Sequence, residues 1–153
     1  MTRGLLKPIV LVEDNPNDLE LTLVALEKAR LANDVVVLRD GAEAIDYLSC
    51  SGSYSSRERG NPAVVLLDIK LPKLTGLDVL EYIKRDAELK SVPVVMLTSS
   101  RQEPDLQRSY ELGVNAYVVK PVSFDDFVRA VQELGGFWAV LNEPPPGSVR
   151  FNR

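Results

Sequence analysis

The sequence predicts an α/β fold in which one parallel sheet of five strands lies between two layers of helices. Five short runs are apolar at every position, which is typical of strands that are buried on both faces. Segments with a helical spacing of apolar residues alternate with these runs, and most links are short. Because such links require parallel pairing and right-handed crossovers, we expect a doubly wound three-layer sandwich. The 153 residues are enough for one domain and argue against two.

Each expected strand is a run of four or five apolar residues, and these runs lie at residues 9–12, 35–38, 63–67, 94–97 and 116–119. Each run is followed by a segment with helical periodicity, at about residues 15–32, 42–48, 75–86, 104–112 and 123–134. Asn15, Pro16, Asn17 and Asp18 are helix-start residues before the first helix, and Asp40 and Gly41 close the second strand. Pro104 suits the first turn of the fourth helix, and Ser123 opens a capping-box spacing before the fifth.

The composition excludes several kinds of chemistry. The chain has no histidine and a single cysteine, Cys50, so histidine-dependent triads, histidine-zinc sites and an intramolecular disulfide are excluded. The formal net charge of −4 and the scattered basic residues give no support to nucleic-acid binding. No stretch resembles a leader or a membrane span, so we expect a cytoplasmic protein.

Two segments do not fit the alternation of strands and helices. Residues 49–61 are rich in Ser, Gly and Arg without an apolar period, and we expect a long surface loop there. Residues 137–153 begin apolar and then break at three consecutive prolines. An aromatic pair in such a tail commonly packs on its own core, but the five-strand unit is complete without it. We therefore expect a domain at residues 7–136 and a C-terminal extension at 137–153, in which Phe137, Trp138 and Leu141 contact a second copy.

Polar side chains follow four of the five expected strands. Glu13 and Asp14 follow the first strand, Asp68 the third, Thr98 the fourth and Lys120 the fifth. The carboxyl ends of parallel strands open onto the crevice where open α/β folds place their chemistry. If the first and third strands are neighbours, three carboxylates crowd together, and a divalent cation would offset their repulsion. Mg²⁺ fits best, because it is held by one or two carboxylates, waters and phosphate oxygens.

A carboxylate beside such a cation can attack phosphorus and form an aspartyl phosphate. The cation and Lys120 would neutralise the transferring group, and the Thr98 hydroxyl would donate a hydrogen bond to it. Taken singly, each residue has a plainer interpretation: Asp68 as a turn residue, Thr98 as a hydroxyl at the sheet edge and Lys120 as a solvated lysine. Their joint occurrence at strand ends favours the functional interpretation.

These residues occur in motifs that resemble the receiver domain of two-component response regulators. The matching motifs are Val12-Glu13-Asp14, residues 66–72 with Gly76, Leu97-Thr98-Ser99 and Tyr117-Val118-Val119-Lys120-Pro121. Together they cover about residues 7–134. The resemblance implies the flavodoxin-like receiver fold and a protein that is phosphorylated on aspartate.

The resemblance also implies roles for several residues of the motifs. Asp68 would be the phosphoacceptor, and Lys120 would pair with the phosphoryl group. Mg²⁺ would be held by Asp14, Asp68 and the backbone carbonyl of Lys70, with Glu13 acting through water.

Five residues take further roles from the same resemblance. Thr98 and Tyr117 would form the conformational switch, although Tyr117 is also explained as a half-buried aromatic. Lys70 and Ser99 would flank the path of the water that slowly hydrolyses the acyl phosphate. The bond before Pro121 would be cis.

The long segment at residues 49–61 and the apolar tail resemble the stand-alone receivers that partner bacterial phytochrome histidine kinases. That closer likeness implies a homodimer and a kinase as partner. The predicted function is a single-domain response regulator that is phosphorylated on Asp68 and signals through protein contacts, without DNA or membrane binding.

Three other functions compete with this prediction. The protein could be a relay intermediate that passes its phosphoryl group to a histidine phosphotransfer protein, which the sequence does not separate from the first function. It could be a receiver-like module that is never phosphorylated, but none of the acid, hydroxyl or lysine positions is missing. An aspartyl-phosphate phosphatase needs a second Asp two residues after the nucleophile, and Lys70 stands there.

Overall fold

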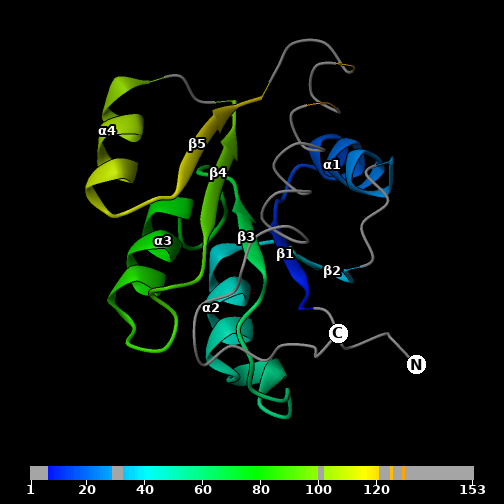
Figure 1. Cartoon of the computed structure of the whole chain (residues 1–153), viewed down its shortest axis with the longest axis vertical. Helices are drawn as coiled ribbons and strands as arrows, with labels where there is room; N and C mark the ends of the chain where they lie inside the picture. Colours follow the sequence, from blue (N-terminus) through cyan, green and yellow to red (C-terminus); the bar gives the residue numbers. More distant parts are fainter. Residues whose placement is uncertain (1–6, 29–32, 100–101, 121–124, 126–128, 130–153) are drawn as a thin grey trace, which may run out of the picture.

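Five parallel strands form the central sheet of the protein (Figure 1). In the computed structural model, which describes residues 7–28, 33–99, 102–120, 125 and 129, the strands are β1 (Ile9–Val12), β2 (Val35–Leu38), β3 (Val64–Leu67), β4 (Val94–Thr98) and β5 (Ala116–Val119). Their order in the sheet is β2-β1-β3-β4-β5, and every neighbouring pair is parallel. The predicted doubly wound sheet is therefore confirmed, with β1 beside β3.

Within the described ranges, four helices and one short 3₁₀ turn accompany the sheet: α1 (Pro16–Lys28), α2 (Gly41–Ser49), η1 (Gly52–Tyr54), α3 (Gly76–Arg85) and α4 (Glu103–Glu111). The bounds of the first four predicted helices agree with these to within a few residues where they can be compared. The predicted helix at 123–134, the bond before Pro121 and the C-terminal extension lie outside the described residues, apart from residues 125 and 129. In the described part of the chain, no helix has the length and apolar character to cross a lipid bilayer.

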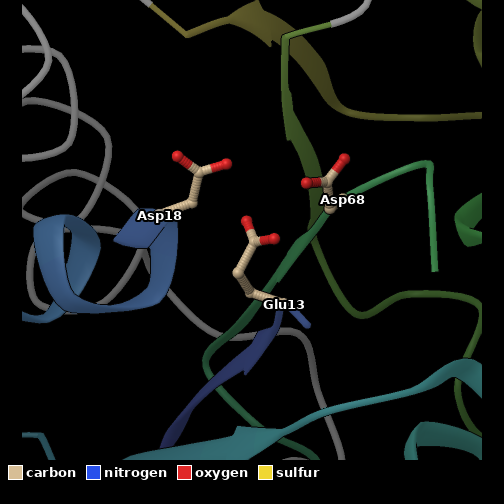
Figure 2. A group of neighbouring side chains, drawn as sticks. All are labelled: Glu13, Asp18 and Asp68. Carbon is tan, nitrogen blue, oxygen red and sulfur yellow. The ribbon is translucent and has the colours of Figure 1, made fainter. Parts of the chain in front are cut away.

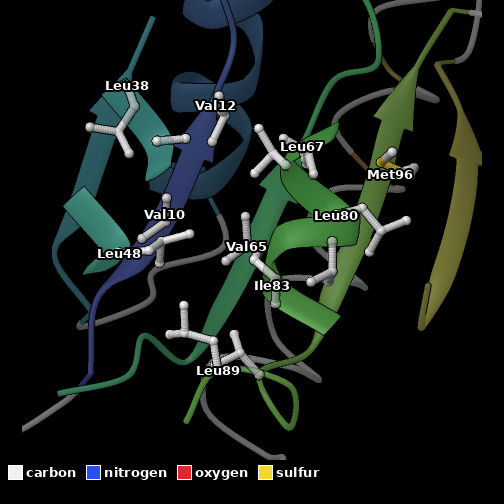
Figure 3. Close-up of a cluster of buried hydrophobic side chains, with 14 of the residues drawn as sticks. Val10, Val12, Leu38, Leu48, Val65, Leu67, Leu80, Ile83, Leu89 and Met96 are labelled. Carbon is white, nitrogen blue, oxygen red and sulfur yellow. The ribbon is translucent and has the colours of Figure 1, made fainter. Parts of the chain in front are cut away.

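Successive residues of each central strand point into two separate cores. In β1, Val10 and Val12 belong to the core on the α2 and α3 side, whereas Ile9 and Leu11 belong to the core on the α1 side. Figure 3 shows the first core, in which side chains of α2 and α3 meet the strands. Burial on both faces is the reason that these strands lack polar positions.

The loop between β3 and α3 is held against α2 and against the end of β3. A Cβ atom on Gly41 would lie 2.0 Å from the carbonyl oxygen of Leu74, and one on Gly76 would lie 2.0 Å from that of Asp68. Glycine is required at both positions because a side chain would overlap backbone atoms. Thr75 and Asp78 then form a reciprocal capping box that starts α3. This packing fixes the backbone that leaves Asp68.

The segment at residues 49–61 is a surface loop, as predicted, and side-chain contacts hold it against α2. The Tyr54 hydroxyl donates to Glu43 Oε2 at 2.6 Å, and the Tyr54 ring meets the Tyr47 ring at 5.2 Å in an edge-to-face arrangement. The Arg57 guanidinium lies 4.1 Å from the Tyr47 ring centroid, and its Nε donates to the Tyr47 carbonyl at 2.8 Å. The predicted surface loop is confirmed, and its contacts with α2 were not predicted because aromatic and cation–π contacts leave no periodic signal in sequence.

Candidate functional site

Two acidic residues are placed at the carboxyl edge of the sheet by backbone pairing that continues beyond the strands. The Glu13 backbone N–H donates to the Leu38 carbonyl at 3.0 Å, and that of Asp68 donates to the Val12 carbonyl at 3.2 Å. Both residues are buried, with 2% and 8% of their surface exposed. Their side chains therefore start from neighbouring, rigid backbone positions at the ends of β1 and β3.

A third carboxylate comes from the first turn of α1. Asn15, which precedes the helix, accepts hydrogen bonds at Oδ1 from the backbone N–H groups of Asn17 and Asp18, at 2.9 and 3.0 Å. This cap fixes the start of α1 and places Asp18 over the end of β1. Figure 2 shows the carboxylates of Glu13, Asp18 and Asp68 converging from β1, α1 and β3.

Lys120 joins the three carboxylates. Its Nζ lies 2.6 Å from Glu13 Oε1, 2.9 Å from Asp18 Oδ2 and 3.2 Å from Asp68 Oδ2. The Lys120 side chain is only 8% exposed. Its backbone N–H donates to the Thr98 carbonyl at 2.7 Å, which continues the pairing of β4 with β5 by one residue. Each of the three N–H donors of the ammonium thus has an anionic acceptor within reach.

Burial and charge shift the pKa of two groups in this cluster. Burial raises the pKa of Glu13 to about 7, the Asp68 charge adds to the effect, and the hydrogen bond from Lys120 opposes it. For Lys120, burial acts to lower the pKa, but the hydrogen bond that its ammonium donates to Glu13 and the charges of Asp68 and Glu13 outweigh burial, so that the pKa is raised. The ammonium therefore stays charged, while Glu13 is poised to gain or lose a proton near neutrality.

The donor set fits a divalent cation that prefers oxygen. One carboxylate oxygen from each of Glu13, Asp18 and Asp68 lies within 4.8 Å of the others. Hard cations such as Mg²⁺ and Mn²⁺ take carboxylate oxygens as ligands. Three carboxylates against one ammonium also leave an excess of negative charge that a cation would offset.

Asp14, a predicted metal ligand, is not one of the three carboxylates that gather here, and its role at a cation stays a prediction. Asp14 is half-buried, and its backbone carbonyl accepts a hydrogen bond from Arg39 Nη2 at 3.4 Å. Asp18 is the third carboxylate around Lys120, and the sequence had identified it only as a helix-start residue. Its one sequence signal was an acid at the third position of a helix that follows a strand end.

The remaining predicted site residues lie around the cluster. Thr98 is buried at the end of β4, and the half-buried Tyr117 packs against the core on the α2 and α3 side. By strand alternation Thr98 and Tyr117 share that face of neighbouring strands. Lys70 and Ser99 are exposed, and the Lys70 backbone N–H lies 3.4 Å from Asp68 Oδ1. The structure thus places Thr98, Lys70 and Ser99 at the same sheet edge as Asp68, whereas Pro121, Phe137, Trp138 and Leu141 lie outside the described residues.

Comparison with known proteins gives relatives that match most of the chain. FilR2, a probable methanogenesis regulatory protein of Methanothrix harundinacea, is 42% identical over 137 residues, which are 90% of this chain and 86% of that protein. The response regulator Rcp1 of Synechocystis sp. is 40% identical over 132 residues, which are 86% of this chain and 88% of that protein.

Solved structures of similar proteins have the same fold. The bacteriophytochrome response regulator AtBRR is 67% identical with a TM-score of 0.73, and the match covers 90% of this chain and 99% of that one. The bacteriophytochrome response regulator RtBRR is 65% identical with a TM-score of 0.75, covering 94% and 86%. The Mn²⁺-bound form of Rcp1 is 39% identical with a TM-score of 0.84, covering 91% and 99%.

The predicted likeness to bacteriophytochrome response regulators is confirmed by these matches. Residues 9–132 match the response regulator receiver domain family. That range includes β1 to β5 and the cluster of Glu13, Asp18, Asp68 and Lys120. The chain therefore belongs to the response regulator receiver family.

Proposed function

We propose that this protein accepts a phosphoryl group on Asp68 from a histidine kinase and passes the signal on through protein contacts. The observation that carries the proposal is the cluster in which Lys120 lies 3.2 Å from Asp68 and 2.6 Å from Glu13. The carboxylate of Asp68, a residue that is 8% exposed, is held beside a fixed ammonium. It is suited to attack an electron-poor phosphorus, because the ammonium can offset charge on the transferring oxygens.

The step transfers one group between two side chains. A new bond joins an Asp68 oxygen to phosphorus, while the bond from phosphorus to a histidine nitrogen of the kinase breaks and the imidazole keeps the electron pair. Lys120 pairs with a phosphoryl oxygen, and the Thr98 hydroxyl donates to another. Glu13, Asp68 and the Lys70 carbonyl, with Asp14, would hold Mg²⁺, which supplies further positive charge when bound. Exposed Lys70 and Ser99 flank the way for a water that slowly hydrolyses the product.

The switch in this proposal is the pair Thr98 and Tyr117. Their position on one face of neighbouring strands supports it, because a shift of Thr98 toward the phosphoryl group changes the space that Tyr117 can fill. The surface that changes would include α4 and β5. Phosphorylation shifts this equilibrium only by the contacts that it makes differently in the two states.

We infer that the partner kinase is a bacterial phytochrome and that the protein acts in the cytoplasm as a homodimer. The identity of 65% and 67% to two bacteriophytochrome response regulators supports the choice of kinase. Sedimentation of the double variant Phe137→Ala with Trp138→Ala tests the dimer. A variant that sediments as the unchanged dimer would remove these residues from the interface.

Phosphotransfer from a bacteriophytochrome kinase that carries labelled phosphate tests the function. We expect label on the wild type and none on Asp68→Asn. Glu58→Gln, which changes an acid in the segment at residues 49–61, is the control and should be labelled like the wild type. Label on Asp68→Asn equal to that on the wild type would refute the assignment of Asp68. Transfer of the label onward to a histidine phosphotransfer protein would indicate the relay role.

A further inference from the structure

Asp18 is at the third position of its helix, where an acid ordinarily accepts a hydrogen bond from the backbone N–H of the residue that caps the helix. It is the third residue of α1, as Asp78 is the third residue of α3. In α3 the Asp78 carboxylate accepts a hydrogen bond from the Thr75 backbone N–H at 3.0 Å, which is the usual role of an acid there. In α1 the equivalent N–H, that of Asn15, donates instead to Glu13 Oε2 at 3.3 Å. The Asp18 carboxylate lies 2.9 Å from Lys120 Nζ.

Asp18 also differs from the two carboxylates with which it shares Lys120. Its side chain is 33% exposed, compared with 3% for Glu13 and 11% for Asp68. It is carried by a helix, whereas the other two follow strands. Its carboxylate is therefore the one of the three that is most open to water and least committed to the buried edge of the sheet.

A cation bound by Glu13 and Asp68 would draw on the oxygens that now hold Lys120. An ammonium whose side chain is 8% exposed would then lose two of its three acceptors. A buried charge without a partner is strongly unfavourable, and a nearby cation adds repulsion. Asp18 is the acceptor of the three that the proposed function leaves to Lys120.

We propose that Asp18 is a positioning residue that keeps the Lys120 ammonium beside Asp68 when a divalent cation engages Glu13 and Asp68. This inference rests on the proposed function, because it takes Asp68 as the phosphoryl acceptor and takes Glu13 and Asp68 as groups that serve the cation. Asp18 acts on the reacting atoms only through Lys120. Without Asp18, the Lys120 ammonium has no acceptor among the three carboxylates once a cation engages Glu13 and Asp68. Loss of Asp18 therefore weakens cation binding by the free energy of that lost ion pair.

A double-mutant cycle with Mn²⁺ as the probe tests this role. Mn²⁺ affinity of the full chain is measured by titration calorimetry for the wild type, Asp18→Asn, Lys120→Met and the double variant. When Lys120 is present, we expect Asp18→Asn to weaken Mn²⁺ binding at least about tenfold. Loss of one charge-assisted hydrogen bond has an effect of this size. In the Lys120→Met background the same change should be about threefold or less. Equal weakening in both backgrounds would mean that Asp18 ligates the cation directly, and would overturn the proposal.

Glu20→Gln is the matched control, because Glu20 is an exposed acid on the same helix. It removes the same unit of charge outside the cluster, so we expect a change of less than about twofold after screening by salt. If Glu20→Gln weakens Mn²⁺ binding as much as Asp18→Asn does, the effect is only one of net charge and the proposal fails.

The NMR signal of the Lys120 side-chain ammonium gives a second test. If Asp18 only stabilised the fold, its replacement would leave this signal unchanged. Its ¹⁵Nζ–H signal in NMR is protected from exchange while the group is held in ion pairs. We expect the signal to persist in the wild type and in Asp18→Glu at saturating Mg²⁺, and to be lost from Asp18→Asn. Persistence in Asp18→Asn would overturn the proposal. Backbone spectra of each variant establish that it is folded.

Beryllofluoride, which stands in for a phosphoryl group on a carboxylate, separates the two possible failures. Binding to the wild type with Mg²⁺, followed by ¹⁹F NMR, supports the proposed function. A wild type that binds Mn²⁺ but not beryllofluoride contradicts the proposed function. A different result contradicts the positioning role of Asp18: equal effects of Asp18→Asn on Mn²⁺ affinity with and without Lys120.

Discussion

The ammonium nitrogen of Lys120 lies 3.2 Å from Oδ2 of Asp68, although 52 residues separate them in the chain. The two residues follow β5 and β3, and β4 lies between these strands. Lys120 therefore reaches across two strand spacings, roughly 10 Å. A long, flexible side chain with a compact charge meets this requirement, and the pairing of Lys120 with Thr98 fixes its starting point.

Replacement of Lys120 by methionine should destabilise the protein in the absence of divalent cations. Three carboxylates would remain within 4.8 Å without a counter-ion, and loss of one partner of a buried ion pair costs about 3–5 kcal/mol. Urea unfolding at pH 8 with EDTA measures the loss. We expect Mg²⁺ to restore most of the stability. Lys90→Met, which changes an exposed lysine, should stay within about 0.5 kcal/mol of the wild type. Equal stability of Lys120→Met and the wild type in EDTA would contradict the role of Lys120 as counter-ion.

Stability without divalent cations should fall between about pH 4.5 and pH 7 because of Glu13. Burial raises its pKa from 4.5 to about 7, so in this window the folded state binds more protons than the unfolded state. The stabilisation is complete below pH 4.5 and is lost as the pH rises through 7. The loss is on the order of 3 kcal/mol.

The difference in unfolding free energy between the wild type and Glu13→Gln, measured in EDTA from pH 4.5 to 8, isolates this effect. Glutamine does not titrate, so the difference should change with pH as Glu13 ionises. A difference that is independent of pH would show that Glu13 keeps an ordinary pKa.

Replacement of Gly41 by alanine should disturb the site from a distance. Its Cβ would lie 2.0 Å from the Leu74 carbonyl oxygen, so the loop between β3 and α3, which carries Lys70, must shift. We expect a loss of about 1–3 kcal/mol in thermal or urea unfolding, together with weaker Mn²⁺ binding. Gly60→Ala is the control, because no heavy atom lies within 4 Å of the new Cβ, and it should be neutral or stabilise by up to about 1 kcal/mol. Similar stability of the two variants would contradict the close approach.

Replacement of Tyr54 by phenylalanine should loosen the segment at residues 49–61. It removes the 2.6 Å hydrogen bond to Glu43, which we expect to cost about 1 kcal/mol. That hydrogen bond is the largest cause that raises the pKa of Tyr54 to about 12, so its stabilisation is lost only as the pH rises through that value. Limited proteolysis measures the opening of the segment, and absorbance at alkaline pH measures the titration. Unchanged protease resistance would show that the Tyr47 and Arg57 contacts suffice.

Local patterns in the sequence determined the sheet and most of the site. Wholly apolar runs identify strands buried on both faces, and the rules for crossovers make the pairing parallel. Once the strands are parallel, residues that follow them must gather at one edge, which is why Glu13, Asp68, Thr98 and Lys120 could be assigned together. The roles of Asp14, Tyr117, Ser99 and Pro121 rested on family resemblance instead, and the roles of all eight residues stay predictions.

Only the tertiary structure decided which acid completes the cluster and how the segment at residues 49–61 is held. Several acids lie near the end of β1, and the packing of α1 on the sheet selects Asp18, rather than Asp14, to meet Lys120. The contacts of Tyr54 and Arg57 with α2 were equally invisible in the sequence. The physical reason is the same in both cases: an ion pair or ring contact depends on the relative orientation of two elements, and that orientation leaves no periodic trace in either of them.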